Sequence, residues 1–118
     1  QTTNDLEKLR EFTVLYKAGP AKDFRLCLCV MYSTDYITLP ENVQDRLTRF
    51  FTANLTWLEQ VMDHGLDVGT LTFKGAAKTQ AHKFLAALQG AQLLARSYNN
   101  IEVFDDISEE LITALANN

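Results

Sequence analysis

The chain has 118 residues, of which 47% are hydrophobic, and it carries a formal net charge of −4 at pH 7. A chain of this length forms one domain and buries about two-thirds of its unfolded surface, so its core needs neither a disulfide nor a metal ion. Its 11 basic residues are spread along the sequence, which argues against a binding surface for DNA or for an anionic membrane. Apolar runs are too short to span a membrane and the first residues do not resemble a signal peptide, so a cytoplasmic protein is expected. The chain starts at Gln1 rather than at methionine, and we expect a longer parent protein.

The first predicted helix covers residues 4–19. Asn4 is a residue type that caps helices and has Glu7 three residues later, while the sequence Gly19-Pro20 ends the helix. One face is apolar and comprises Leu6, Leu9, Phe12, Leu15 and Tyr16.

Residues 21–37 contain LCLCVMY, a run that is apolar on every side and suits a buried strand as well as a buried helix. No other segment offers a strand partner, and an isolated strand leaves its backbone groups unpaired. We therefore predict a helix from about Lys22 to Ser33. Cys27 and Cys29 lie in this run, and residues two apart on a helix point about 200° apart, so we interpret both as buried thiols rather than as ligands of a metal ion.

The longest predicted helix covers residues 39–65. Its start is indicated by Thr38 and Glu41, which have the spacing of a capping box, and by Pro40, which fits a first turn. Its end is predicted at Gly65, because glycine readily adopts a left-handed backbone conformation. Apolar residues recur at steps of three and four: Val43, Leu47, Phe50, Phe51, Leu55, Leu58, Val61 and Met62.

After a connection without periodicity, we predict a fourth helix from Phe73 to Tyr98, with Thr72 as its cap. Small and apolar residues occupy two of its faces, so this helix is expected either in the middle of the domain or between the core and a partner chain. Gly90 within it lowers helix stability by about 1 kcal/mol relative to alanine, which the close approach of another helix can offset.

The last predicted helix covers residues 101–116. The two-residue turn Asn99-Asn100 places it antiparallel to the helix before it. Its apolar face comprises Ile101, Phe104, Ile107, Leu111 and Leu115. The sequence therefore predicts an all-α fold, an antiparallel bundle of about five helices in a single domain spanning residues 1–118.

Few residues suggest a catalytic, metal-binding or phosphate-binding site. Asp63-His64 resembles part of a catalytic relay, but the sequence places no nucleophile, and a surface cation at a helix end explains His64 better. His82 is expected in solvent, opposite the apolar face of its helix. The sequence has no Glu-x-x-His pattern and no glycine-rich phosphate loop. We expect no enzymatic activity, no catalytic residue, no metal site and no cofactor.

Most aromatic residues fit a core, although a subset could line a cavity for a small molecule.

Several short segments follow one another in an informative order. They are Cys27-Leu28, Leu39-Pro40-Glu41, Phe50-Phe51 leading to Trp57-Leu58, Gly65 with Gly69-x-Leu71, and Ala87-Leu88-Gln89-Gly90-Ala91 through Leu94-Ala95-Arg96. Over residues 5–116, this order resembles the C-terminal regulatory domain of TetR-family transcriptional regulators.

The resemblance implies an all-helical domain that binds a small effector, dimerises through its last two helices and follows a helix-turn-helix domain. That DNA-binding domain is missing from this sequence, so residues 1–19 are expected to be its connector helix. The parent protein is then expected to be a regulator of transcription, a repressor, whose DNA affinity changes when the effector binds.

The expected partners are a second copy of the chain in a homodimer and an unidentified, largely apolar effector, with DNA bound only through the missing domain and no membrane involved. Candidate ligand-binding residues, chosen by position, are Met31, Tyr32, Phe51, Leu55, Leu58 and Phe84. Candidate dimer-interface residues are Phe84, Leu88, Ala91, Ala95, Phe104, Ile107 and Leu111.

A function of another class remains open at this point. The chain could be a free-standing helical module that binds a different protein, without ligand or DNA. This alternative predicts no internal cavity, and either a monomer or a dimer that uses another face.

Overall fold

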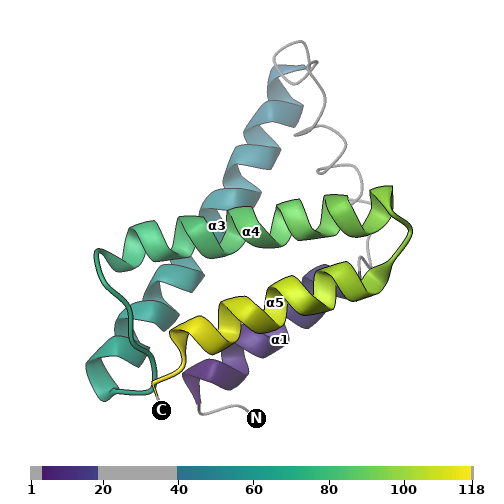
Figure 1. The fold of residues 1–118 in the computed structure, drawn as a ribbon. Helices are drawn as coiled ribbons and strands as arrows, with labels where there is room; N and C mark the ends of the chain where they lie inside the picture. The colour runs from purple at the N-terminus through teal and green to yellow at the C-terminus, as the bar shows by residue number, and fades with distance from the viewer. Residues whose placement is uncertain (1–3, 19–39, 118) are drawn as a thin grey trace.

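Figure 1 shows the computed structural model of the chain, which describes residues 4–18 and 40–117. The described residues form four helices: α1 (Asp5–Ala18), α3 (Glu41–Val68), α4 (Ala77–Ser97) and α5 (Ile101–Leu115). α4 and α5 lie side by side and antiparallel, α1 runs along α5, and α4 crosses α3. The predicted all-α fold is confirmed. The predicted helix from Lys22 to Ser33, with its two cysteines, lies outside the described residues.

α1 begins where the sequence predicts. The side-chain oxygen of Asn4 accepts a hydrogen bond of 2.7 Å from the backbone N–H of Leu6, which satisfies one of the free donors of the first turn. The predicted apolar face is buried at Leu9, Phe12 and Tyr16, whereas Leu15 is 58% exposed. Leu15 lies to one side of the stripe defined by the three buried residues, because each residue turns the helix by about 100°.

α3 extends one turn beyond its predicted end. The helix ends at Val68, and Gly69 is the residue with the left-handed conformation, at φ 90°. Gly65 is buried inside the helix, where a Cβ atom would lie 2.5 Å from Leu71 Cγ. The glycine at position 65 is thus explained by the close approach of Leu71, and the prediction of a helix end there was wrong. At the other end Pro40 is the N-cap, and Thr38 lies outside the described residues.

α4 begins at Ala77, four residues later than Phe73, and Thr72 does not cap it. Instead, the backbone N–H of Thr72 donates a 2.8 Å hydrogen bond to the carbonyl oxygen of Leu115, and Leu71 pairs with Ala116 as an antiparallel bridge. The end of α5 therefore holds residues 71–72 in an extended conformation. This tertiary contact outweighs the local preference of the sequence for a helix start at Thr72.

The turn between α4 and α5 agrees with the sequence. Asn99 has a positive φ of 54°, which asparagine tolerates better than most residues. Asn100 is the N-cap of α5, and its side chain accepts a 3.0 Å hydrogen bond from the backbone N–H of Glu102. The predicted antiparallel arrangement of the last two helices is confirmed (Figure 1).

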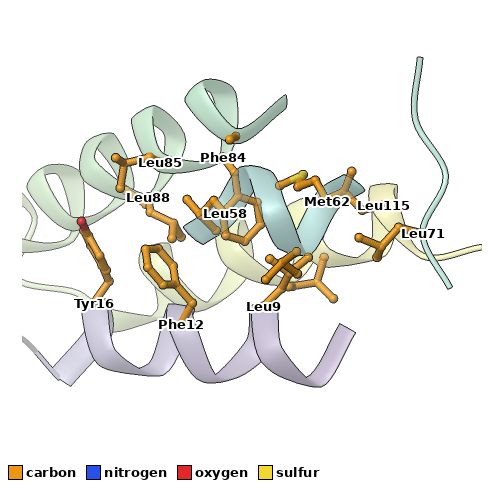
Figure 2. Packing of buried hydrophobic residues seen from close by; sticks show 14 of the residues in the cluster. Leu9, Phe12, Tyr16, Leu58, Met62, Leu71, Phe84, Leu85, Leu88 and Leu115 are labelled. Carbon is orange, nitrogen blue, oxygen red and sulfur yellow. The ribbon is translucent and has the colours of Figure 1, made fainter. Parts of the chain in front are cut away.

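The core forms where all four helices meet, as Figure 2 shows. Its most deeply buried apolar side chains come from every helix and from the connection after α3: Leu9, Tyr16, Leu58, Met62, Leu71, Phe84, Leu88, Phe104 and Ile112. Burial of one such side chain contributes about 1.5–3 kcal/mol to stability. On α4 the buried residues share a single face, and the second face of small and apolar residues is half-buried or exposed.

None of the described helices is long and apolar enough to cross a membrane. The described residues also contain no group of three or more His, Cys, Asp or Glu side chains placed to hold a metal ion.

Candidate functional site

An open apolar groove lies between α3 and α4, which we call the α3–α4 groove. Phe51 and Leu55 of α3 and Leu85 and Ala86 of α4 form its apolar walls, and the cavity has a volume of about 440 Å³. Cavities of about 300–1,000 Å³ hold drug-sized ligands. The remaining lining residues are His82 and Gln89 of α4, which add polar groups to the wall.

Helical spacing brings these residues together. Phe51 and Leu55 are four residues apart and share one face of α3, while His82, Ala86 and Gln89 recur on one side of α4 at steps of four and three. The ring of Phe51 also meets that of Phe50 edge-on, with centroids 5.4 Å apart and planes at 71°. This edge-to-face contact restricts how Phe51 presents its ring to the groove.

His82 has a defined hydrogen bond within its own helix. Its Nδ1 lies 2.8 Å from the carbonyl oxygen of Lys78, four residues earlier. A carbonyl oxygen only accepts hydrogen bonds, so Nδ1 must carry the proton and donate. In the neutral ring, Nε2 is then unprotonated and available as an acceptor, on the edge of the ring away from the backbone of α4.

A second groove lies between α1 and α3. Its apolar lining includes Phe12, Leu15 and Phe50, and its volume is about 420 Å³. Trp57 completes this wall and stacks on Phe12, with ring centroids 5.5 Å apart and planes at 19°. Lys8 and Glu11 line the same groove, so its rim is charged.

A third cavity, of about 420 Å³, lies at the corner between the connection before α4, α4 itself and α5. Its floor contains Phe73, Phe84 and Leu115, and Lys74 and Lys83 stand among its lining residues. The three cavities therefore differ in charge, and only the α3–α4 groove is lined by no Lys, Arg, Asp or Glu among the described residues.

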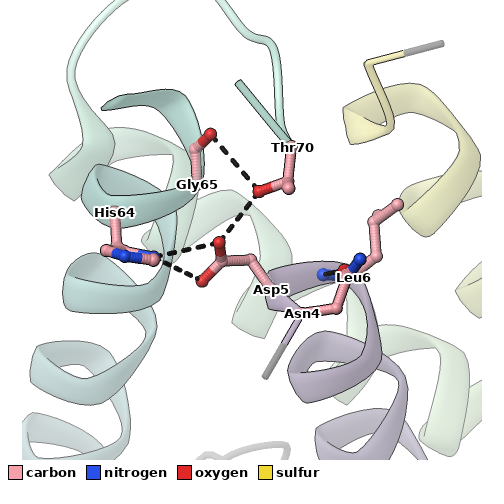
Figure 3. A network of polar contacts seen from close by, with 6 residues as sticks. All are labelled: Asn4, Asp5, Leu6, His64, Gly65 and Thr70. Atoms are coloured by element: carbon pink, nitrogen blue, oxygen red, sulfur yellow. Dashed lines mark hydrogen bonds and ion pairs between the residues drawn. The ribbon is translucent and has the colours of Figure 1, made fainter. Parts of the chain in front are cut away.

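A buried polar cluster joins the start of α1 to the end of α3 (Figure 3). The carboxylate of Asp5 is 1% exposed and accepts a 2.8 Å hydrogen bond from the hydroxyl of Thr70. Its two oxygens lie 3.1 and 3.0 Å from Nδ1 of His64, whose side chain is 57% exposed. The partner of His64 is thus Asp5 from another helix, and His64 does not lie at the helix end that the sequence predicts. The Thr70 hydroxyl donates to Asp5 rather than to His64, so the cluster is not arranged as a catalytic triad.

Two solved structures share this arrangement of helices. A TetR-family transcriptional regulator from Agrobacterium tumefaciens matches with a TM-score of 0.85 and 26% sequence identity, over 98% of this chain and 62% of that chain. The chain has the TetR-family fold. The reduced form of NemR from E. coli also matches, with a TM-score of 0.80 and 20% identity, over 98% of this chain and 60% of that chain.

The TetR-like chain spans less than two-thirds of the length of both proteins. No protein-family model matches its sequence, and a comparison with curated protein sequences finds no match. The similarity is therefore carried by the three-dimensional arrangement of the helices.

The structure brings together two of the six ligand-binding residues predicted from the sequence. Phe51 and Leu55 line the α3–α4 groove of the TetR-like chain. Leu58 is 0% exposed and belongs to the core, and Phe84, at 2%, touches only the third cavity. Met31 and Tyr32 lie outside the described residues.

The sequence reasoning missed the residues that α4 contributes to the groove. They are His82, Leu85, Ala86 and Gln89. A signal was present, because His82 and Gln89 are seven residues apart and flank Leu85 and Ala86 on one side of the helix. His82 was assigned to solvent, and it is exposed, but it also forms part of the groove wall.

Most of the predicted dimer-interface residues lie in the core of the TetR-like chain. Phe84, Leu88, Ala91, Ala95 and Phe104 are at most 6% exposed and pack within one chain, whereas Ile107 and Leu111 are half-buried. The same two helices carry small and apolar residues at their surface, which we call the α4–α5 outer face: Ala87, Gly90, Leu94, Val103, Ile107, Leu111 and Ala114. Leu111 and Ala114 of α5 line the third cavity together with Lys83 of α4, so these sides of the two helices are neighbours.

Proposed function

We propose that this TetR-like chain is the effector-binding and dimerisation domain of a transcriptional regulator whose remaining part binds DNA. The observation that carries the proposal is the α3–α4 groove, an apolar cavity of about 440 Å³ within a TetR-family fold. In the parent protein, an effector that binds one arrangement of the helices more tightly shifts the population towards it. The two DNA-binding domains of the dimer then change their spacing, and with it their affinity for the operator.

The role is that of a ligand-controlled repressor in the cytoplasm, without enzymatic activity. Residues 1–19 are the proposed connector between the two domains, since α1 is the first described helix and contacts α3, α4 and α5. The ligand-binding residues that we propose are Phe51 and Leu55, retained from the sequence prediction, together with His82, Leu85, Ala86 and Gln89.

The proposed dimer uses the α4–α5 outer face. Leu94 is 42% exposed there, and no heavy atom lies within 4 Å of a Cβ atom built at Gly90. A partner helix can therefore approach the backbone of α4 closely at Gly90, which would offset the helix-destabilising effect of glycine. This supports the interface without using the side chains that pack in the core.

The oligomeric state tests this part of the proposal. Leu94→Glu places a charge in the proposed interface, so light scattering should find a dimer for the wild type and a folded monomer for the variant. Leu66→Glu is the matched control, because Leu66 is 44% exposed but lies at the end of α3. A wild-type monomer, or equal dissociation of both variants, would favour the alternative of a helical module that binds another protein.

Effector binding is tested by filling the groove. Ala86 is exposed and lines the α3–α4 groove, so Ala86→Trp should occupy it without disturbing the core. Apolar small molecules that raise the midpoint of thermal unfolding of the wild type should then lose this effect, because a ligand stabilises only the state it binds. Thr113→Trp, at an exposed position of α5 that lines none of the three cavities, should retain it. Equal ligand effects in both variants would place the effector site elsewhere.

A further inference from the structure

The wall of the α3–α4 groove contains one hydrogen-bonding group whose role is set by the helix itself. Nδ1 of His82 donates to the carbonyl oxygen of Lys78 at 2.8 Å, which leaves Nε2 of the neutral ring as an acceptor. The hydrogen bond also restrains the ring, since rotating it would break the contact with Lys78. A ligand in the groove therefore meets an acceptor in a fixed orientation.

The other lining groups limit what can bind. Phe51, Leu55, Leu85 and Ala86 offer apolar surface, against which a flat ring gains the most contact. No Lys, Arg, Asp or Glu lines the groove among the described residues, so a charged ligand would lose hydration without gaining an ion pair. Apolar walls with one acceptor fit an uncharged, aromatic ligand that carries a hydrogen-bond donor.

We propose that His82 selects the ligand class of the α3–α4 groove, which takes an uncharged aromatic molecule whose hydroxyl group donates a hydrogen bond to His82 Nε2. The inference rests on the proposed function, because it specifies the effector of the same groove. Gln89 lies seven residues further along α4, about 10 Å at 1.5 Å per residue. Its amide can bond a second polar group at the far end of a ligand with one or two rings.

Two matched probes separate the hydrogen bond from the apolar contact. 2-Naphthol carries the hydroxyl donor, and 2-methoxynaphthalene has the same rings without it. The ether is the more apolar molecule, so without the hydrogen bond it should bind at least as tightly as the naphthol. With the hydrogen bond, the wild-type chain should bind 2-naphthol at least about 3-fold more tightly than the ether.

The dissociation constants are measured by two-dimensional amide NMR titration, which also locates the bound probe. His82→Phe keeps an aromatic ring but removes the acceptor, so it should reverse or abolish the preference for the naphthol while the ether still binds. His82→Gln restores a side-chain acceptor and should recover part of the preference. Thr113→Val, at an exposed position of α5 that does not line the groove, is the control and should leave the preference unchanged.

The outcomes distinguish the two proposals. If both probes bind in the groove with equal affinity and His82→Phe changes nothing, the role of His82 is overturned while the groove remains a binding site. If the naphthol instead perturbs residues around Trp57, the site lies in the groove between α1 and α3 and the inference fails. If neither probe binds at its solubility limit, the α3–α4 groove is not a site for this ligand class, and the inference is rejected whatever the dimer measurement shows.

Discussion

Asp5 is the residue whose environment departs most from expectation. A carboxylate at the first position of a helix is common on a protein surface, yet this one is 1% exposed. Its position at the start of α1 is favourable, because the N-terminal end of a helix stabilises negative charge. The Thr70 hydroxyl and the His64 ring supply the hydrogen bonds that a buried carboxylate requires.

The substitution Asp5→Ala should therefore destabilise the domain. It removes the acceptor of the Thr70 hydroxyl and the partner of His64, and we expect the free energy of unfolding to fall by about 1–3 kcal/mol. Urea denaturation followed by circular dichroism measures the change. Asp63→Ala is the control, since Asp63 is exposed and adjacent to His64 in sequence. Equal effects of the two substitutions would show that the buried cluster contributes nothing specific.

Two glycines within helices allow a comparison in which only the surrounding space differs. A Cβ atom at Gly65 would meet Leu71 Cγ at 2.5 Å, whereas at Gly90 nothing lies within 4 Å. Gly65→Ala should lower stability by about 1–3 kcal/mol through overpacking, while Gly90→Ala should raise it by up to about 1 kcal/mol through helix propensity. Thermal and urea unfolding are best measured in the Leu94→Glu background, so that dimerisation does not contribute. A gain in stability for Gly65→Ala would contradict the contact with Leu71.

At the scale of elements, one buried side chain of α4 adds a hydrogen bond to the apolar contacts between α1 and α4. The amide Nε2 of Gln92, 8% exposed, donates a hydrogen bond to the carbonyl oxygen of Tyr16, near the end of α1. The last carbonyl groups of a helix have no partner within it, so a side chain from a neighbouring helix can satisfy one of them.

Gln92→Leu should lower the free energy of unfolding by about 1–3 kcal/mol, because the carbonyl of Tyr16 loses a buried partner. Gln89→Leu is the matched control: it lies one turn earlier on α4, and no hydrogen bond of its side chain to a described residue is observed. Hydrogen exchange of the α1 amides would report the change locally, with faster exchange expected only in the Gln92 variant. Similar exchange in both variants would contradict this role of the Gln92 hydrogen bond.

The helix boundaries show where sequence reasoning works and where it stops. Asn4 and Asn100 cap their helices as the sequence predicts, because capping depends on groups within one turn of the chain. Gly65 and Thr72 were misread, because their roles depend on Leu71 and Leu115, which reach them through the tertiary fold. Local signals cannot reveal such contacts.

The candidate site was predictable to a smaller extent. Phe51 and Leu55 could be chosen because they lie on the apolar stripe of α3. Leu58 lies on the same stripe but is buried in the core, and the difference depends on where α4 crosses α3. His82 was overlooked because periodicity marks it as exposed, which is correct but does not show that an exposed residue borders a groove.

At the scale of the whole molecule, α1 is part of the core. It contacts α3, α4 and α5, and Leu9, Phe12 and Tyr16 on it are at most 6% exposed. A helix that is built into the core in this way responds to any rearrangement of the other three helices. This is the property that the proposed coupling between effector and DNA requires.

Deletion of residues 1–18 should therefore abolish cooperative folding of the domain. The deletion exposes the side chains of α3, α4 and α5 that pack against α1, so we expect a loss of the cooperative thermal transition and binding of a hydrophobic dye. Deletion of residues 1–3 is the control and should leave the transition in place. A cooperative transition in the longer deletion would mean that α3, α4 and α5 fold without α1.

Thr70 lies between the two ends of the described chain. Its hydroxyl donates to Asp5 near the beginning, and its carbonyl oxygen accepts a 3.3 Å hydrogen bond from the backbone N–H of Asn117 near the end. A short linker can therefore join the two ends at little cost in loop-closure entropy. The exposed turn at Asn99 and Asn100 offers a place to open the chain again. The arrangement of the helices in space therefore does not depend on which helix comes first in the polypeptide. A circular permutant that starts with α5 can keep the same bundle.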